Sequence, residues 1–182
     1  GTNFQYRINY GDGTDWDFTN SQAISTNAGD VIQWKGVNSN GLSKDYNNYI
    51  SFEIPNEAHL SGNVMSLIDG VGDTQVIPCN YCFCNLFQNT KIKTVTEDFL
   101  PVTTLTEGCY GGMFEGCSAL VNAPALPATT LTSKCYNGMF LSCSSLVTAP
   151  VLPAETLAGS CYSYMFKGCT SLKNAPALPA TT

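Results

Sequence analysis

The chain has 182 residues, of which 43% are hydrophobic and 12% are charged, and its net charge is −6, so we expect a globular protein of one or two domains. The acidic balance argues against nucleic-acid binding, which needs clustered Lys and Arg for the phosphates. No apolar run approaches the roughly 20 residues that cross a bilayer, so no transmembrane segment is expected in this chain.

Residues 1–60 have the pattern of a small β-rich N-terminal domain. The segments "FQYRINY", "DVIQWKG" and "NYISFEI" alternate apolar and polar residues in period two, which predicts strands. Asp-Gly within "GDGTDW" predicts a tight turn. We expect an antiparallel, sandwich-like domain of four to six strands. Residues 61–81 would form a junction and cap before the next part of the chain.

Aromatic and acidic residues of this domain raise two site hypotheses. Trp16 and Trp34 would line an aromatic platform for a sugar, although aromatics at alternate strand positions more often belong to a core. Asp12, Asp15 and Asp17 gather the carboxylates that calcium prefers, but their order lacks the D-x-[DN]-x-[DN]-G pattern of a calcium loop. We predict no metal site and no cofactor.

From residue 82 the chain repeats one phrase with a period of 26 residues. "CYGGMFEGCSALVNAPALPATTL" returns as "CYNGMFLSCSSLVTAPVLPAETL" and "CYSYMFKGCTSLKNAPALPATT", and "CFCNLFQNTKIKTVTEDFLPVTTL" matches the same frame less well. The units cover about residues 82–108, 109–134, 135–160 and 161–182, with the last one incomplete. A fixed period in the twenties predicts stacked coils.

Each unit divides into two halves with different patterns. Cys135, Met139, Phe140 and Cys143 lie at i, i+4, i+5 and i+8, which is one face of a short helix. The second half has short apolar residues and two prolines, which predicts a very short strand followed by a turn. One strand, one turn and one helix in each unit predict a leucine-rich-repeat solenoid over residues 82–182.

The chain has nine cysteines, and six of them recur at two fixed positions of the last three units. The rise along a helix and the spacing between helices are too long for disulfides within or between units, so we expect columns of small hydrophobic side chains in a narrow core. "PCNYCFC" crowds Cys79, Cys82 and Cys84, but the second half of a zinc site is missing and the only histidine, His59, lies far upstream. Cys82 would be the first member of a column, and a local disulfide between its neighbours Cys79 and Cys84 stays open.

The "MFxGCxSLxxAPxLPAxTL" pattern resembles the BspA-like leucine-rich repeats of cell-surface proteins from Bacteroidetes-type bacteria. The upstream "GDVIQWKG" and "GNVMSL" resemble the small β domain before such repeats. This resemblance implies a secreted or surface protein, as a lipoprotein or in secreted form, that binds a host factor and has no catalytic residues. The chain lacks a signal peptide and stops at Thr182 within a unit, so we expect it to be trimmed from a longer protein.

Catalytic constellations are not apparent in the sequence, because His59 is alone and the repeats have few acids to support it. Binding fits a repeated surface better, and the positions after the leucine of each short strand should point outward. We predict that this strip contacts a host or matrix protein or a polysaccharide. The alternative is a carbohydrate-binding β domain, with Trp16 and Trp34, displayed on a repeat spacer. The strip consists of Val121, Asn122, Val147, Thr148, Lys173 and Asn174.

Overall fold

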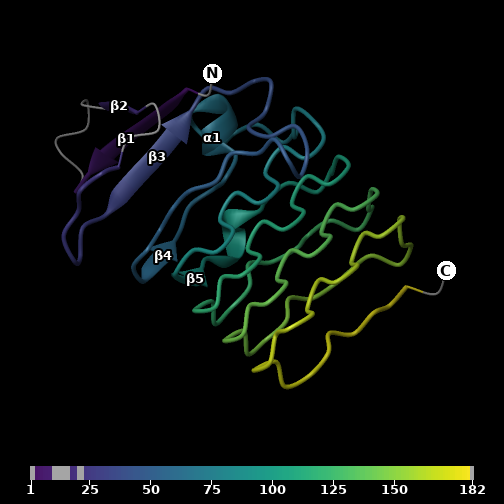
Figure 1. Cartoon of the computed structure of the whole chain (residues 1–182). Helices are drawn as coiled ribbons and strands as arrows, with labels where there is room; N and C mark the ends of the chain where they lie inside the picture. The colour runs from purple at the N-terminus through teal and green to yellow at the C-terminus, as the bar shows by residue number, and fades with distance from the viewer. Residues whose placement is uncertain (1–2, 10–16, 20–22, 181–182) are drawn as a thin grey trace.

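The N-terminal part of the chain forms one three-stranded antiparallel sheet. The computed structural model describes residues 3–9, 17–19 and 23–180, and within them the strands β1 (Phe4–Ile8), β2 (Asp17–Thr19) and β3 (Ile32–Gly36) lie in the order β2-β1-β3. Strand β1 pairs with β3 over its whole length, and Figure 1 shows this sheet at one end of the molecule. The predicted strands near residues 4–10 and 30–36 are therefore confirmed in type, with shorter bounds.

The third predicted strand, residues 48–54, belongs to no sheet. Its apolar residues are half-buried and alternate with exposed Ser51 and Glu53, as the pattern requires. Its backbone bonds to the chain only at scattered points, such as Phe52 N donating to Leu86 O at 2.8 Å. Alternation alone therefore identified the buried face but not a pairing partner, which a strand also needs.

The remaining regular elements are short and lie either before the repeats or within the first repeat. Strand β4 (Ala58–Leu60) pairs in parallel with β5 (Ile92–Val95), and the single described α-helix, α1 (Ser66–Asp69), ends at Gly70 in the left-handed conformation. A 3₁₀ turn, η1 (Glu97–Phe99), follows β5.

Residues 80–180 form successive turns of chain that lie side by side (Figure 1), which we call the repeat stack. In the first half of each repeat, alternate backbone N–H groups donate to carbonyls of the next repeat. Tyr110 N donates to Cys135 O at 3.0 Å, and Phe114 N donates to Met139 O at 3.0 Å. The intervening residues donate to the carbonyl three positions back, as Met113 does to Tyr110 at 3.2 Å. Half of these backbone bonds are thus local, and half join neighbouring repeats.

Every fourth residue of these segments has a left-handed backbone. A right-handed helix has negative φ throughout and i to i−4 bonds, so this periodic change of sign excludes one. Glycine adopts positive φ without strain, whereas the Cβ of Lys or Ser makes the same conformation strained. In two successive repeats the values of φ are +60°, +61° and +72° at Gly108, Gly112 and Gly116, and +57°, +59° and +61° at Lys134, Gly138 and Ser142.

The predicted fold class is therefore wrong. In place of an antiparallel sandwich followed by a leucine-rich-repeat solenoid, the described residues have two small sheets and are mostly non-helical. The first half of each repeat is the turn structure above. In the second half the prolines remove ladder donors, and only isolated bridges remain, Thr104 with Thr130 and Asn122 with Thr148.

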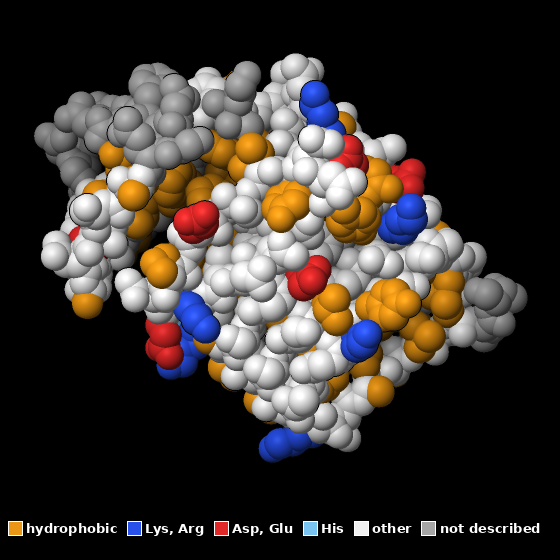
Figure 2. Space-filling model, viewed as in Figure 1, with side chains coloured by type: hydrophobic (Ala, Val, Ile, Leu, Met, Phe, Trp, Pro, Cys, Tyr) orange, Lys and Arg blue, Asp and Glu red, His pale blue; other side chains and the backbone are white. Residues whose placement is uncertain are grey.

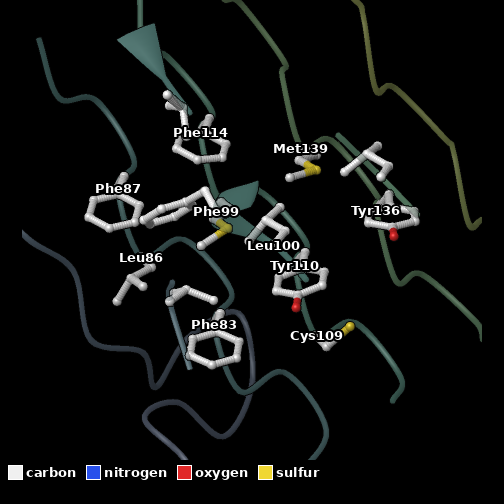
Figure 3. Close-up of a cluster of buried hydrophobic side chains, with 14 of the residues drawn as sticks. Phe83, Leu86, Phe87, Phe99, Leu100, Cys109, Tyr110, Phe114, Tyr136 and Met139 are labelled. Atoms are coloured by element: carbon white, nitrogen blue, oxygen red, sulfur yellow. The ribbon is translucent and has the colours of Figure 1, made fainter. Parts of the chain in front are cut away.

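Equivalent side chains of successive repeats form buried columns. Figure 3 shows part of this core, with Phe87, Phe99 and Phe114 grouped around one centre. Because each ring stacks nearly parallel on the ring of the next repeat, one column of aromatics continues through all the repeats. The ring centroids are 5.7 Å apart for Phe87 and Phe114, and 5.9 Å apart both for Phe114 and Phe140 and for Phe140 and Phe166.

The cysteine columns are also inside, so the prediction of a buried sulfur core is confirmed. All nine cysteines are free thiols, and eight of them are buried. In the column of Cys117, Cys143 and Cys169, each thiol donates to the phenylalanine carbonyl of the preceding repeat at 3.0 Å, as Cys143 does to Phe114. Cys117 and Cys169 make the same bond to Phe87 and Phe140. A cysteine here fills a small apolar space and also satisfies a buried carbonyl.

The first repeat is covered by the segment before it. The ring of Phe52 stacks on Phe87 with the centroids 5.5 Å apart, which extends the phenylalanine column by one ring. The hydroxyl of Tyr46 lies so close to Gly111 that a Cβ there would be 2.2 Å away. A glycine is therefore required at position 111 for this segment to pack on the repeat stack.

Candidate binding surface

Two neighbouring repeats form a shallow open groove of about 350 Å³ at the predicted strip. Of the six predicted residues, four line this groove, and Val121 and Asn122 continue the strip into the preceding repeat. Valine, alanine and proline side chains make part of the lining apolar, and one threonine, one asparagine and one lysine supply its polar groups. It consists of Val147, Thr148, Ala149, Lys173, Asn174, Ala175 and Pro176.

Backbone pairing brings the equivalent positions into register. Val147 N donates to Val121 O at 3.1 Å, and Val121 N donates to Lys93 O at 2.9 Å. The two valines are 38% and 36% exposed, so each offers part of its side chain to solvent. Thr148 and Asn174 are exposed as well. The strip is thus a row of like positions, one pair in each repeat.

Asn122 differs from the other members of the strip because its amide is used in packing. Its Nδ2 donates to Val95 O at 2.7 Å, while its Oδ1 is buried without a protein partner. This amide joins two repeats and is only partly available to a ligand.

The strip continues past the residues that the sequence indicated, toward β4. Thr94 lies on β5 and shares a 2.6 Å hydrogen bond with Nδ1 of exposed His59, and Lys93 forms a 3.0 Å salt bridge with Glu57. Sequence reasoning missed these residues because the parallel pairing of β4 with β5 joins segments more than thirty residues apart. The only sequence signal for this continuation of the strip was the imperfect match of the repeat before Cys109.

A second groove lies in another part of the repeats and was not predicted. Its lining is nearly all threonine, and Thr104 and Thr130 are joined by a parallel bridge. The recurring "TTL" phrase of the sequence was the available signal. The lining residues are Thr103, Thr104, Leu105, Thr129, Thr130 and Thr132.

The alternative sugar platform receives little support from its one described member. Trp34 is half-buried, and its ring packs against Phe52 at 4.9 Å, Tyr6 at 5.7 Å and Phe4 at 6.5 Å between centroids. These contacts favour a role in the core. Trp16, Asp12 and Asp15 lie outside the described residues.

The crowded cysteines do not converge with other metal ligands in the described part of the chain, where no group of three or more His, Cys, Asp or Glu side chains is placed to hold an ion. The thiol of Cys84 donates to Asp45 O at 3.4 Å. Burial raises the pKa of Cys84 to about 12, so this thiol stays protonated near neutral pH.

Charge is sparse over the repeats, and Figure 2 shows only scattered Lys, Arg, Asp and Glu on the face in view. Lys134 and Glu107 approach to 3.7 Å, whereas no salt bridge to Lys173 is found among the residues described. Within the same residues, none of the helices is both long and apolar enough to cross a membrane.

Comparisons with protein-family models, with curated proteins and with solved structures each find no match to this chain. The resemblance to BspA-like repeats therefore rests on the sequence phrase alone.

Proposed function

We propose that this protein binds an extended ligand without catalysis, along the strip that runs from Val121 to Asn174. The ligand is a stretch of a host or matrix protein, or a polysaccharide. The observation that carries this proposal is the register between repeats, which aligns four of the six predicted positions along one open groove and sets Val121 and Asn122 beside them in the preceding repeat.

The chemistry of the strip favours an extended polymer. Valine, alanine and proline offer apolar contact, while Thr148 and Asn174 supply hydrogen-bonding groups beside them. Because the pair of positions recurs in each repeat, a ligand with its own repeat along the chain can make the same contact several times. Repetition of a weak contact raises the total affinity when the geometry allows simultaneous binding.

Lys173 gives the groove a preference for a negative group. Its ammonium is exposed at the groove and has no salt bridge among the described residues. A carboxylate or sulfate on the ligand would find a charge partner there, and this contribution would weaken as salt screens it. An acidic glycan or an acidic protein segment is the best fit.

The test compares two pairs of substitutions in different grooves. Thr148→Glu with Asn174→Glu fills the predicted groove and adds negative charge, so binding to immobilised matrix proteins or glycans should weaken by about tenfold or more. Thr104→Glu with Thr130→Glu makes the same chemical change in the threonine groove and should leave binding unchanged. Equal loss in both variants, or loss only in the second, would overturn the proposal.

We also propose that the protein acts at the bacterial cell surface, as the resemblance to BspA-like repeats implies. Labelling of intact cells with an antibody against the repeat stack tests this location. Signal only after permeabilisation would contradict it.

A further inference from the structure

The first repeat replaces a recurring threonine with cysteine. Thr106 and Thr132 stand three residues before Cys109 and Cys135 in their repeats. The hydroxyl of Thr132 donates to Thr106 O at 2.8 Å, and the hydroxyl of Thr106 donates to Cys79 O at 2.7 Å. This series of bonds places Cys79 at the threonine position of the first repeat, three residues before Cys82.

In the second and third repeats the threonine at this position lies beside the cysteine three residues ahead, whereas the last repeat has Ala158 there. Hydrogen bonds from the Thr106 and Thr132 side chains lower the pKa of Cys109 and Cys135, against the larger effect of burial that raises both. In the first repeat the equivalent pair consists of two thiols, Cys79 and Cys82, and the Cys79 thiol also donates to Ser43 O at 3.6 Å.

Gly41 leaves room for this pair of thiols. A Cβ at Gly41 would lie 2.2 Å from Cys79 Sγ and 3.2 Å from Cys82 Sγ, so both sulfurs border the same point. With φ of +83° the position also favours glycine. Cys84, the third cysteine of the cluster, is directed instead to Asp45 O.

The two thiols differ in access to solvent. Cys79 is only partly buried, whereas Cys82 is completely buried. A small reagent can therefore reach Cys79 first. The buried Cys82 is then the neighbouring thiol that can release the reagent from Cys79 by forming the protein disulfide. The Cys-x-x-Cys spacing suits such a reaction, because a short turn brings both sulfurs together.

We propose that Cys79 and Cys82 form a reversible dithiol–disulfide site that is oxidised by a small-molecule disulfide such as oxidised glutathione. The Cys79 thiolate attacks one glutathione sulfur, forms a mixed disulfide and releases the first glutathione. The Cys82 thiolate then attacks Cys79 Sγ, closes the protein disulfide and releases the second. The protein loses two electrons and two protons, and oxidised glutathione gains both as two thiols.

The reaction should be slow at neutral pH and faster in mild base. Burial raises the pKa of Cys79 and of Cys82, so little of either thiol is ionised near pH 7. While the pH stays below the thiol pKa, the thiolate fraction and hence the rate should rise about tenfold for each pH unit.

The experiment treats the folded full chain with excess oxidised glutathione at two mildly alkaline pH values and maps the products by mass spectrometry. Wild type should lose two hydrogens between Cys79 and Cys82, and dithiothreitol should restore them. Cys82→Ser should stop at a glutathione adduct on Cys79. Cys79→Thr copies the residue of the next two repeats, so it should fold and give neither product.

Two controls separate this site from general thiol oxidation. Cys84→Ser should leave the Cys79–Cys82 disulfide and its rate unchanged. Thr106→Cys in the Cys79→Thr background should move the disulfide to the second repeat, where Cys109 is the partner. Absence of an intramolecular product in wild type, a persistent glutathione adduct on wild-type Cys79, or pairing with Cys84 would each overturn the proposal.

Discussion

The three-stranded sheet and the repeat stack bury aromatic side chains with two different backbones. In the sheet, β1 and β3 pair residue by residue from Phe4 with Gly36 to Ile8 with Ile32. In the repeat stack, alternate N–H groups reach the next repeat while the others bond three residues back, and every fourth residue has positive φ. Both arrangements satisfy buried backbone groups, as they must.

The difference shows what a sequence period determines. A 26-residue period makes equivalent residues neighbours, so Phe114 meets Phe140 and Tyr110 meets Tyr136 whatever the backbone does between them. The conformation within the period depends on which residues tolerate positive φ, and that is a separate property. The sheet has no such period, and its pairings depend on turns and long-range contacts.

The largest loss of stability should come from removing a ring from the middle of the phenylalanine column. Phe114 is fully buried between two rings, so Phe114→Ala should cost about 3–5 kcal/mol of unfolding free energy. Among the described residues Phe166 stacks on one ring, that of Phe140, and it is half-buried, so Phe166→Ala should cost about half as much. Urea unfolding followed by circular dichroism measures both. Equal costs would show that the end of the stack is as tightly packed as its centre.

Alkaline pH should destabilise the repeat stack, because all nine cysteines lie at or after residue 79. Burial raises the pKa of Cys109 to about 12 and that of Cys135 to about 11, whereas thiols of the unfolded chain ionise near pH 9. The stability due to the protonated thiols is complete below pH 9 and falls as the pH rises toward the folded values. Cys109 and Cys135 should each cost about 1.4 kcal/mol per pH unit in that window.

Urea unfolding at a series of pH values from 8 to 10 measures this loss. A Cys109→Ala, Cys135→Ala double variant serves as the control, since it removes two of the titrating groups and should flatten the pH dependence. A wild-type stability that is constant to pH 10 would mean that these thiols ionise in the folded protein.

The sequence predicted the buried side chains of the repeat stack better than its backbone. The spacing of Cys135, Met139, Phe140 and Cys143 correctly placed all four inside, but the assumed helix was wrong. The glycines at Gly108, Gly112 and Gly116 carried the missing information, because their spacing of four matches the positions of positive φ. In the next repeat Lys134 and Ser142 occupy two of those positions, which hides the signal.

The candidate binding surface was predicted in part for the same reason. Repetition located Val147, Thr148, Lys173 and Asn174, which line one groove, without any knowledge of the backbone. It could not show that the amide of Asn122 bonds to Val95, or that His59 extends the strip through Thr94. Both contacts involve β5 of the first repeat, which matches the repeat frame least well, and His59 comes from a segment that has no period.

A matched pair of glycines should separate backbone strain from side-chain contact in the repeat stack. Gly112 and Gly138 have φ of +61° and +59°, so alanine at either position should cost about 1 kcal/mol through the backbone alone. At Gly112 the new Cβ would also lie 2.1 Å from Asn85 Oδ1, whereas at Gly138 nothing is closer than 3.9 Å. Gly112→Ala should therefore be about twice as destabilising in urea unfolding. Equal costs would show that Asn85 moves aside freely.

The smallest expected effect is the difference in stability between two substitutions of a thiol that bonds to the neighbouring repeat. Cys143 Sγ donates to Phe114 O at 3.0 Å, so Cys143→Ala removes the donor and leaves a carbonyl without that partner, at a cost of about 1–2 kcal/mol. Cys143→Ser keeps a donor in nearly the same place. In the first repeat Thr90 stands at this position, so a hydroxyl is accepted there, although its Oγ1 donates within its own repeat, to Phe87 O at 2.9 Å. Serine should therefore be less destabilising than alanine in urea unfolding. The opposite order would mean that cysteine is used there for its apolar volume and that the bond contributes little.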